Sequence, residues 1–206
     1  NKYKLYKIIM FLEYTYKVFN SVIPPHVCEE IIKLGLSSGV KTGVTADKDS
    51  NNLSKEDLLN LQKIRHSNIS WLDGEWIYKW IRPCVEETLK EWKYDINYID
   101  NFQFTIYKKN QFYGWHSDYF PNKNPKARDR KVSLSISLSD PKDYEGGELE
   151  LIVDDVPGKR HSIVCKQLSP RGSIAIFPSF VIHRVNPVTK GTRYSLVIWH
   201  EGPKWK

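Results

Sequence analysis

The chain has 206 residues, of which 31 are Lys or Arg and 24 are Asp or Glu, so its formal net charge is +7. This length and a charged content of 27% suit one globular domain with a single core. The scattered basic residues favour a solvated surface that attracts anionic ligands, and they argue against a specific nucleic-acid partner. Three widely spaced cysteines without a CxxC motif argue against a disulfide framework or a zinc ribbon and favour a reducing compartment.

The start of the chain carries no signal that we can connect to a function. The apolar run Ile8–Leu12 is too short to cross a membrane, and no small-residue cleavage site follows it. We therefore predict an N-terminal extension over residues 1–13 and a single domain over residues 14–206. A cytoplasmic location without a membrane partner is expected.

Helix signals dominate before residue 95. An initial proline and a later glycine predict a helix in PPHVCEEIIKLGLSSG, and Ser54–Leu61 (SKEDLLNL) predicts a short capped helix. Apolar residues at three- and four-residue spacings predict an amphipathic helix in EWIYKWIRPCVEETLKEW, which Pro83 should kink or split. The polar segment Ser38–Asn52 is long enough to be a lid or a mobile loop.

Strand and turn signals follow. The segment KVSLSISLSD alternates, with apolar residues on one face (Val132, Leu134, Ile136 and Leu138) and serines on the other. Turns that contain Gly and Pro separate the further predicted strands YIDNFQFTIY, GELELIV, GSIAIFP, HRVNPV and TRYSLVIWH, while GKRHS is predicted as a loop. Many short strands at this spacing predict an antiparallel jelly roll, and the helices before it should pack on one sheet.

A histidine and an aspartate stand close together in QFYGWHSDYF. His116 and Asp118 are two residues apart, so on a strand both side chains share one face. His183, far downstream, supplies a second imidazole. Two imidazoles and one carboxylate form the ligand set of non-haem Fe(II) oxygenases, which leaves positions open on the metal. These residues alone leave both a metal site and a structural role open, because such a pair on a strand is more often structural.

Arg193 adds a candidate for binding a carboxylate. Thr192–His200 is predicted as a strand antiparallel to the one that starts at His183. A guanidinium there could form a two-pronged bond to a carboxylate. Ser195 lies two residues later on the same face and could donate to the same group. A surface ion pair is the alternative role for Arg193.

The chain resembles the prolyl 4-hydroxylase-like branch of the Fe(II)/2-oxoglutarate dioxygenases, including its small bacterial and phage hydroxylases. The resemblance runs from about Tyr14 to Lys206 and is carried by YKKNQFYGWHSD, DYEGGELEL, FPSFVIHRV and PVTKGTRYSLVIWHEGP. It implies an α+β, mainly β, double-stranded β-helix (jelly-roll, cupin-like) core. It also implies that His116, Asp118 and His183 hold Fe(II).

The resemblance further implies roles around the metal. Arg193 is expected to act in catalysis by binding the far carboxylate of 2-oxoglutarate, although many prolyl hydroxylases carry Lys at this place. Tyr107 is expected to hydrogen-bond the same carboxylate, and Trp199 to lie near the metal pocket as a cofactor-binding residue. Tyr113 matches a tyrosine on the substrate side. Core packing is the alternative role for each aromatic residue.

Two more residues are candidate substrate contacts on weaker grounds. Trp115 belongs to an aromatic-rich front that could pack an extended peptide or a proline ring, and Arg160 could reach a substrate from its predicted loop. Asp118 favours hydroxylation over halogenation, because related halogenases lack this carboxylate. Nucleic-acid demethylases of the same superfamily carry a second arginine where this chain has Trp199, which argues against a nucleic-acid substrate.

The implied activity is hydroxylation of a C–H bond with Fe(II), 2-oxoglutarate and O2, with ascorbate as reductant and with succinate and CO2 as products. The implied substrate is a prolyl residue in a peptide or protein. A free amino acid or another small metabolite is the alternative substrate. A non-catalytic, cupin-like binding module is the alternative function.

Overall fold

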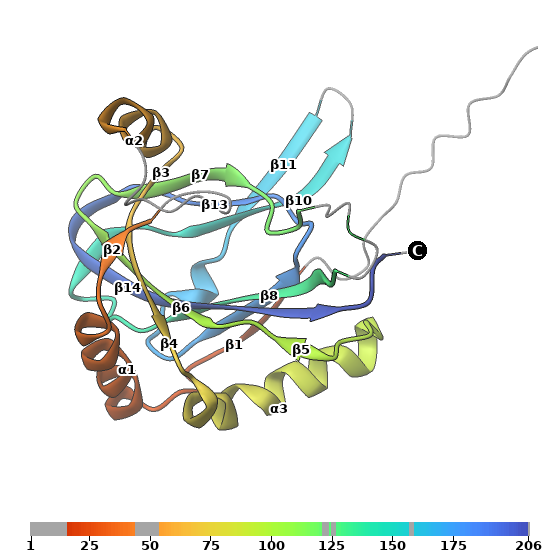
Figure 1. Ribbon diagram of the computed structural model, residues 1–206. Coiled ribbons are helices and arrows are strands. Elements are labelled where there is room, and N and C mark those ends of the chain that lie inside the picture. Colours follow the sequence, from red (N-terminus) through yellow and green to blue (C-terminus); the bar gives the residue numbers. More distant parts are fainter. Residues whose placement is uncertain (1–15, 44–53, 121–123, 125–126, 157–158, 206) are drawn as a thin grey trace, which may run out of the picture.

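The computed structural model describes residues 16–43, 54–120, 124, 127–156 and 159–205, and it contains two antiparallel sheets that face each other (Figure 1). The larger sheet follows the order β1-β12-β8-β14-β6-β4-β2, with β5 and β9 also paired to β14. Its strands are β1 (Lys17–Phe19), β2 (Lys41–Thr42), β4 (Asn68–Leu72), β5 (Tyr98–Ile99), β6 (Phe102–Lys108), β8 (Asp129–Ser137), β9 (Tyr144–Gly146), β12 (Ile174–Pro178) and β14 (Val188–Gly202).

The smaller sheet follows the order β11-β10-β13-β7-β3. Its strands are β3 (Arg65–His66), β7 (Phe112–His116), β10 (Leu149–Val156), β11 (Lys159–Val164) and β13 (His183–Val185). A short 3-10 helix, η2 (Lys166–Leu168), follows β11. Two facing antiparallel sheets with helices against one of them confirm the predicted mainly-β jelly roll. The predicted extension 1–13 and most of the predicted lid lie outside the described residues.

Helices cover the outer face of the larger sheet, as predicted (Figure 1). They are α1 (Pro25–Ser37) and α3 (Glu75–Trp92), whereas α2 (Lys55–Gln62) lies beside β3 of the smaller sheet. The Ser54 hydroxyl accepts a hydrogen bond from the Asp57 N–H at 3.1 Å, so the predicted cap of α2 is confirmed.

The helix α3 runs through Pro83 without a break, so Pro83 does not split it as predicted. A proline inside a helix costs about 3 kcal/mol because it removes one N–H donor and crowds the preceding turn. The buried side chains of Ile77, Ile81 and Val85 lie on either side of it and pack on the sheet. Since each buried aliphatic side chain contributes about 1.5–3 kcal/mol, their packing outweighs this cost.

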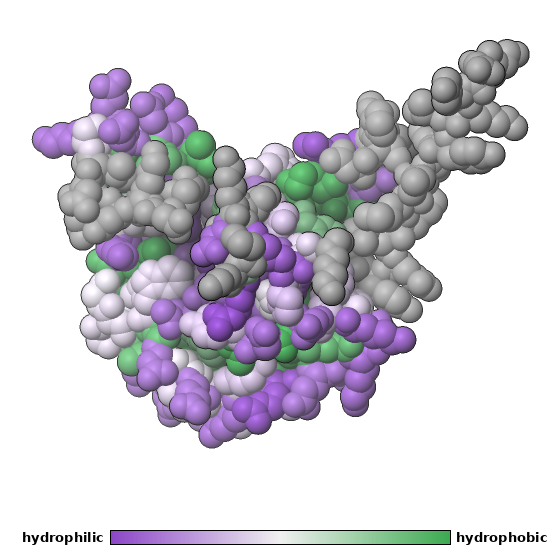
Figure 2. Space-filling view, turned by 45° about the vertical axis from the view of Figure 1, so that its right-hand side comes forward, coloured by the Kyte–Doolittle hydropathy of each residue, from purple (hydrophilic) through white to green (hydrophobic). Residues whose placement is uncertain are grey.

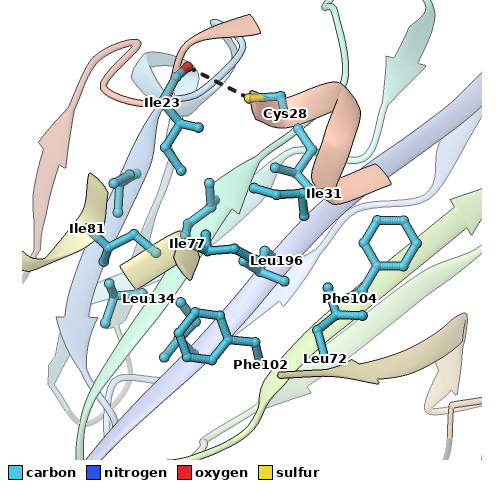
Figure 3. Close-up of a cluster of buried hydrophobic side chains, with 14 of the residues drawn as sticks. Ile23, Cys28, Ile31, Leu72, Ile77, Ile81, Phe102, Phe104, Leu134 and Leu196 are labelled. Carbon is cyan, nitrogen blue, oxygen red and sulfur yellow. Dashed lines mark hydrogen bonds between the residues drawn. The ribbon is translucent and has the colours of Figure 1, made fainter. Parts of the chain in front are cut away.

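The main core lies between these helices and the larger sheet (Figure 3). Ile31 of α1 and Ile77 of α3 meet Phe104 and Leu196 of the central strands, and all four are fully buried. The alternation of β8 produces this arrangement, because its apolar residues point toward the helices. The core therefore occupies one face of the larger sheet, and the opposite face borders the space between the two sheets.

The opposite face of β8 is polar and also buried, which the alternation alone did not predict. Ser133, Ser135 and Ser137 are at most 6% exposed, because the smaller sheet covers them. Buried hydroxyls need partners. A polar surface between two sheets is thus a natural place for a polar ligand.

Two predictions about the strands are wrong. The segment GKRHS is not a loop, because Lys159–Val164 forms β11 and pairs with β10. The strand with Arg193, β14, does not pair with the strand that starts at His183. β14 pairs with β5, β6, β8 and β9, and β13 pairs with β7 and β10 of the other sheet. Arg193 and His183 therefore lie on different sheets.

The visible surface is mainly hydrophilic, with separate smaller hydrophobic areas (Figure 2). Within the described residues, we find no helix with the length and apolar character needed to cross a membrane.

His200 of β14 is a buried histidine whose protonation should weaken the fold in acid. Its side chain is 1% exposed, and its Nε2 atom lies 2.9 Å from the Tyr78 hydroxyl of α3. Burial lowers the pKa of His200 from 6.5 to about 4. As the pH falls, the unfolded chain therefore binds a proton first, and the free energy of unfolding drops between pH 6.5 and about 4.

We expect this single group to reduce the free energy of unfolding by about 2 kcal/mol between pH ~7 and pH ~5. The His200→Gln variant keeps an acceptor for Tyr78 but does not titrate. Urea unfolding of both proteins at the two pH values measures the difference. Equal pH dependence in wild type and variant would contradict the prediction.

Candidate metal centre

Three candidate ligands meet between the sheets. His116 ends β7 and His183 begins β13, and the two residues are direct partners in the register of the smaller sheet. Asp118 follows β7, and the ligand atoms of the three residues lie within 4.8 Å of one another. The Asp118 oxygens lie 3.7 Å from His116 Nε2 and 3.6 Å from His183 Nε2. Two atoms that each lie about 2.1 Å from one ion are at most about 4.2 Å apart, so these separations fit a shared ion.

Backbone carbonyls orient both imidazoles. His116 Nδ1 lies 2.8 Å from the Gly114 carbonyl oxygen, and His183 Nδ1 lies 2.9 Å from that of Val181. A carbonyl oxygen can only accept, so each Nδ1 carries the proton and each Nε2 presents its lone pair. This is the tautomer and orientation that a metal-binding imidazole needs.

The charges of the cluster also suit a divalent ion. Burial opposes ionisation of Asp118, but the neighbouring His183 and His116 hold the pKa of its carboxyl below the usual value. Burial and the neighbouring His183 lower the pKa of His116 to about 3. One carboxylate and a neutral imidazole are therefore ready to bind without losing protons. This donor set fits Fe(II).

A cavity of about 680 Å³ opens beside the three ligands. This volume lies within the range of about 300–1,000 Å³ found for small-molecule sites. Both sheets contribute to its walls, which include the uncharged residues Gln103, Tyr107, Tyr113, Leu149, Phe177, Val185, Ser195, Val197 and Trp199. Charged residues also line it, namely Lys41, Arg65, Asp100, Arg128, Arg130 and Glu201. The ligands thus face a space that could hold both a co-substrate and part of a substrate.

Arg193 is buried beside residues that line this cavity, and its charge is not neutralised by any described residue. The side chain is 2% exposed, forms no ion pair in the described part of the chain, and its Nη1 atom has no hydrogen-bond partner there. It pairs directly with Tyr107 of β6, and its guanidinium lies 5.6 Å from that ring. Because a buried cation without an anion is costly, the site fits a ligand carboxylate such as that of 2-oxoglutarate.

Tyr107 and Ser195 stand next to Arg193, as predicted for a shared carboxylate. Burial raises the pKa of Tyr107, so its phenol stays protonated and can donate. Ser195 lies two residues after Arg193 on the same face, and both Tyr107 and Ser195 line the cavity. The structure therefore brings together the residues predicted to hold the far carboxylate.

Gly147 leaves the space that Arg193 occupies. Its φ is +70°, and a Cβ atom there would lie 2.9 Å from Arg193 Cδ and 2.8 Å from Val188 Cγ2. We expect Gly147→Ala to displace the guanidinium and to raise the KM for 2-oxoglutarate about 10- to 100-fold, as small misplacements of binding groups do. Steady-state kinetics measure this change.

Gly39→Ala is the matched control for that variant. Gly39 has a φ of +72° but nothing within 4 Å of the added Cβ, so it shares the backbone strain without the clash. An unchanged KM in Gly147→Ala, or an equal rise in both variants, would contradict the packing argument.

Tyr113 reaches the cavity because β7 contains an irregularity. His183 pairs with His116 and Val185 with Tyr113, so three residue steps on β7 match two on β13. Strict alternation would turn Tyr113 away from His116, but here the two rings stack with their centroids 3.5 Å apart. Burial raises the pKa of Tyr113 to about 12, so its phenol remains a hydrogen-bond donor beside the ligands.

Two predicted substrate contacts lie away from the cavity. Trp115 is adjacent to His116 on β7 and does not line the cavity; its ring is 37% exposed and lies 4.5 Å from the Arg184 guanidinium. Neighbouring residues on a strand point to opposite faces, which explains this position. Arg160 is an exposed residue of β11, in a hairpin that extends beyond the two sheets (Figure 1), and it does not line the cavity either.

Arg65 is a cavity residue that the sequence alone did not single out. It is 5% exposed, its Nε donates to the Ser67 hydroxyl at 2.9 Å, and its guanidinium lies 4.7 Å from the Tyr113 ring centroid. The alternation in RHSNISWL could have placed Arg65 on one face with Trp71. No sequence spacing connects that face with the ligands, which lie on another part of the chain.

The sequence matches a known family over its strand-rich part. Residues 102–201 match the profile of the 2OG-Fe(II) oxygenase superfamily. A PKHD-type hydroxylase of Xylella fastidiosa (strain M12) is 36% identical over 104 residues, which cover 47% of this chain and 42% of the relative. A PKHD-type hydroxylase of Psychrobacter sp. (strain PRwf-1) is 39% identical over 99 residues, which cover 47% of this chain and 36% of the relative. The chain thus spans less than half the length of these curated relatives.

The fold is shared with solved prolyl hydroxylases. The viral collagen prolyl hydroxylase of Paramecium Bursaria Chlorella virus-1 aligns with a TM-score of 0.62 at 18% identity, over 94% of this chain and 99% of that one. A Pseudomonas putida prolyl-4-hydroxylase aligns with a TM-score of 0.63 at 19% identity, over 93% of this chain and 95% of that one. A Trichoplax adhaerens prolyl hydroxylase, solved in complex with a hypoxia inducible factor peptide fragment, aligns with a TM-score of 0.63 at 20% identity. The alignment covers 90% of this chain and 83% of that one. The segment 102–201 thus matches the 2OG-Fe(II) oxygenase superfamily and contains the His116–Asp118–His183 cluster, and the chain has the fold of solved prolyl 4-hydroxylases.

Proposed function

We propose that this chain is an Fe(II)- and 2-oxoglutarate-dependent dioxygenase that hydroxylates a C–H bond and releases succinate and CO2. One observation carries the proposal. Two imidazoles and a carboxylate meet beside a cavity, and next to that cavity lies a buried guanidinium with an unpartnered Nη1 among the described residues. A metal site and a carboxylate site so close together fit a chelating co-substrate with a second, distant carboxylate.

In this proposal His116, Asp118 and His183 hold the metal on one side and leave its other positions open to the cavity. When bound, Fe(II) together with O2 and 2-oxoglutarate supplies the oxidising power that hydroxylation of a C–H bond needs. Ascorbate would serve as the reductant that maintains Fe(II). The protein contributes orientation and a partly dry site.

Arg193, Tyr107 and Ser195 would hold the far carboxylate of 2-oxoglutarate. The guanidinium neutralises its charge, and the two hydroxyls donate hydrogen bonds to it. Because Arg193 and Tyr107 are paired across adjacent strands, their relative position is fixed before the ligand arrives. Fixed donors lower the entropy that is lost when the co-substrate is oriented.

The proposed substrate is a prolyl residue in a peptide or protein. The support is the prolyl hydroxylase fold, and one structural neighbour is solved with a peptide fragment. Tyr113 is the candidate substrate contact that lines the cavity. A free amino acid or another small metabolite is the second candidate, because a cavity of about 680 Å³ can also enclose such a molecule.

The test is to incubate the protein with Fe(II), ascorbate, 2-oxoglutarate and proline-containing peptides. We expect succinate in step with a peptide mass gain of one oxygen. A mass gain of one oxygen on free amino acids, but on none of the peptides, would favour a free amino acid as the substrate. No release of succinate with any of these molecules would contradict the proposed activity.

A further inference from the structure

The turn between β12 and β13 touches two of the three candidate ligands. The Ser179 carbonyl oxygen accepts hydrogen bonds from the backbone N–H groups of Asp118 and Tyr119, each at 3.0 Å. Two residues later, the Val181 carbonyl oxygen lies 2.9 Å from His183 Nδ1 and accepts a hydrogen bond from it. One turn thus holds the backbone of one candidate ligand and the ring of another.

The serine between the first two candidate ligands binds the same turn. The Ser117 hydroxyl donates to the Ser179 carbonyl oxygen at 3.0 Å and accepts a hydrogen bond from the Tyr119 N–H at 3.1 Å. A hydroxyl has one proton to donate and two lone pairs, so both hydrogen bonds can form together. The side chain of Ser117 therefore closes a hydrogen-bonded loop around Asp118, which lies between Ser117 and Tyr119 in the chain.

The turn is a firm point of attachment because its polar groups are bonded to the larger sheet. Ser179 is fully buried, and its N–H donates to the Lys131 carbonyl of β8 at 3.0 Å. The Ser179 hydroxyl lies 3.0 Å from that of Ser133, also in β8. The Val181 N–H donates to the carbonyl of Pro178, the last residue of β12, at 2.9 Å. A segment bonded to Ser179 is therefore fixed relative to both β8 and β13.

Asp118 depends on this attachment because it lies beyond the end of β7. The pairing of β7 with β13 places His116 opposite His183, and His116 is the last residue of β7. The hydrogen bonds to Ser179 hold the chain from there onward. The Asp118 carboxylate then stands 3.6 Å from His183 Nε2, within the span of a shared ion.

We propose that Ser117 is a positioning residue, whose hydroxyl fixes the segment after β7 on the turn before β13 and thereby sets the distance from Asp118 to His183. The proposal rests on the proposed metal site. Without this hydroxyl, the segment can shift about its two remaining backbone bonds to Ser179. A metal site needs ligand distances within about 0.2 Å of their standard values, so a small shift lowers its affinity.

Calorimetric titration with Co(II), used as the probe ion on the whole chain, tests this role without relying on turnover. We expect Ser117→Ala to weaken Co(II) affinity about tenfold, the lower end of the usual cost of losing an outer partner, because the backbone bonds to Ser179 remain. The visible absorption of bound Co(II) should change as well. Ser117→Thr keeps the hydroxyl and should bind Co(II) within about threefold of wild type, whereas Ser117→Val, of nearly the same shape, should behave like Ser117→Ala.

Ser38→Ala is the matched control, because Ser38 is also a partly buried serine whose hydroxyl donates to a backbone carbonyl. Its acceptor is the Leu34 carbonyl, at 2.7 Å. Ser38 stands at the C-terminal end of α1, and this hydrogen bond involves neither the turn nor a candidate ligand. The variant should lose stability, but its Co(II) affinity and the absorption of bound Co(II) should stay constant.

The outcomes separate this role from the proposed function. Failure of the wild-type protein to bind Co(II) would count against the metal site itself. Normal binding by wild type, together with unchanged affinity and absorption in Ser117→Ala, would overturn the positioning role alone. Equal Co(II) affinities of Ser117→Thr and Ser117→Val would overturn it too, and this pair decides if Ser117→Ala does not fold.

Discussion

Replacement of Asp118 by asparagine is expected to lower Co(II) or Fe(II) affinity by more than about a hundredfold and to remove succinate release. The reason is the charge of the site, because the only anionic ligand of the described cluster is lost and two imidazoles remain. Even the loss of an outer partner of a metal ligand costs about 10- to 100-fold in affinity, so loss of the ligand itself should cost more. Thermal unfolding with and without Co(II) measures the effect, because a bound ion stabilises only the protein that binds it.

Asp129→Asn is the control for the Asp118 variant. Asp129 is a second buried aspartate, 3% exposed, and it accepts a hydrogen bond from the Trp205 N–H at 2.8 Å without lining the cavity. The Asp129→Asn variant makes the same chemical change as Asp118→Asn at a similarly buried position. If Asp118→Asn keeps wild-type Co(II) stabilisation, or if both variants lose it equally, the ligand assignment is wrong.

Replacement of Arg193 by methionine is expected to raise the KM for 2-oxoglutarate by at least about 30-fold. The side chain is 2% exposed, and its Nη1 has no described partner, so a bound carboxylate would be its main anionic contact. Loss of one member of a buried charged pair costs about 2–5 kcal/mol, and about 1.4 kcal/mol corresponds to a factor of ten in affinity. Methionine keeps much of the volume, so packing changes should be small. Kinetics at varied 2-oxoglutarate concentration measure the effect.

Two further variants check the origin of that increase. Tyr107→Phe removes one hydrogen bond but leaves the charge, so its KM should rise by only about tenfold. Arg171→Met changes an arginine that is paired with Glu29 and lies outside the cavity, and its KM for 2-oxoglutarate should stay unchanged. A larger effect in Tyr107→Phe than in Arg193→Met would show that the guanidinium is not the main carboxylate contact.

The alternation of apolar and polar residues along the strands predicted much of the fold. In β8 the apolar residues Leu134 and Ile136 face the helices, as their spacing requires. The pairing of the strands could not be predicted in the same way, because the periodicity of apolar residues gives the face on which a side chain lies but not which strand is its neighbour. This is why the strand of Arg193 was paired wrongly with the strand of His183. Pro83 does not split α3, since tertiary packing outweighs a local helix penalty.

The candidate site was predicted to different degrees at different positions. Residues in distinctive motifs, such as His116 and Arg193, were identified from the sequence. Trp115 lies outside the cavity because its neighbour His116 points into it, and alternation then turns Trp115 outward. Tyr113 reaches the cavity only through a register shift that no spacing reveals.

The length of β14 limits how the side chains on its cavity-side face can be rearranged. This single strand carries Arg193 and, six residues later, Trp199, on the same face. At about 3.3 Å per residue, it spans about 20 Å between these positions, with no loop that could adjust the interval. β14 therefore holds Arg193 and Trp199 at a fixed interval on one face of the larger sheet. Inserting one residue between them would turn either Arg193 or Trp199 toward the helices, so an insertion in this strand would remove one of the two side chains from this face.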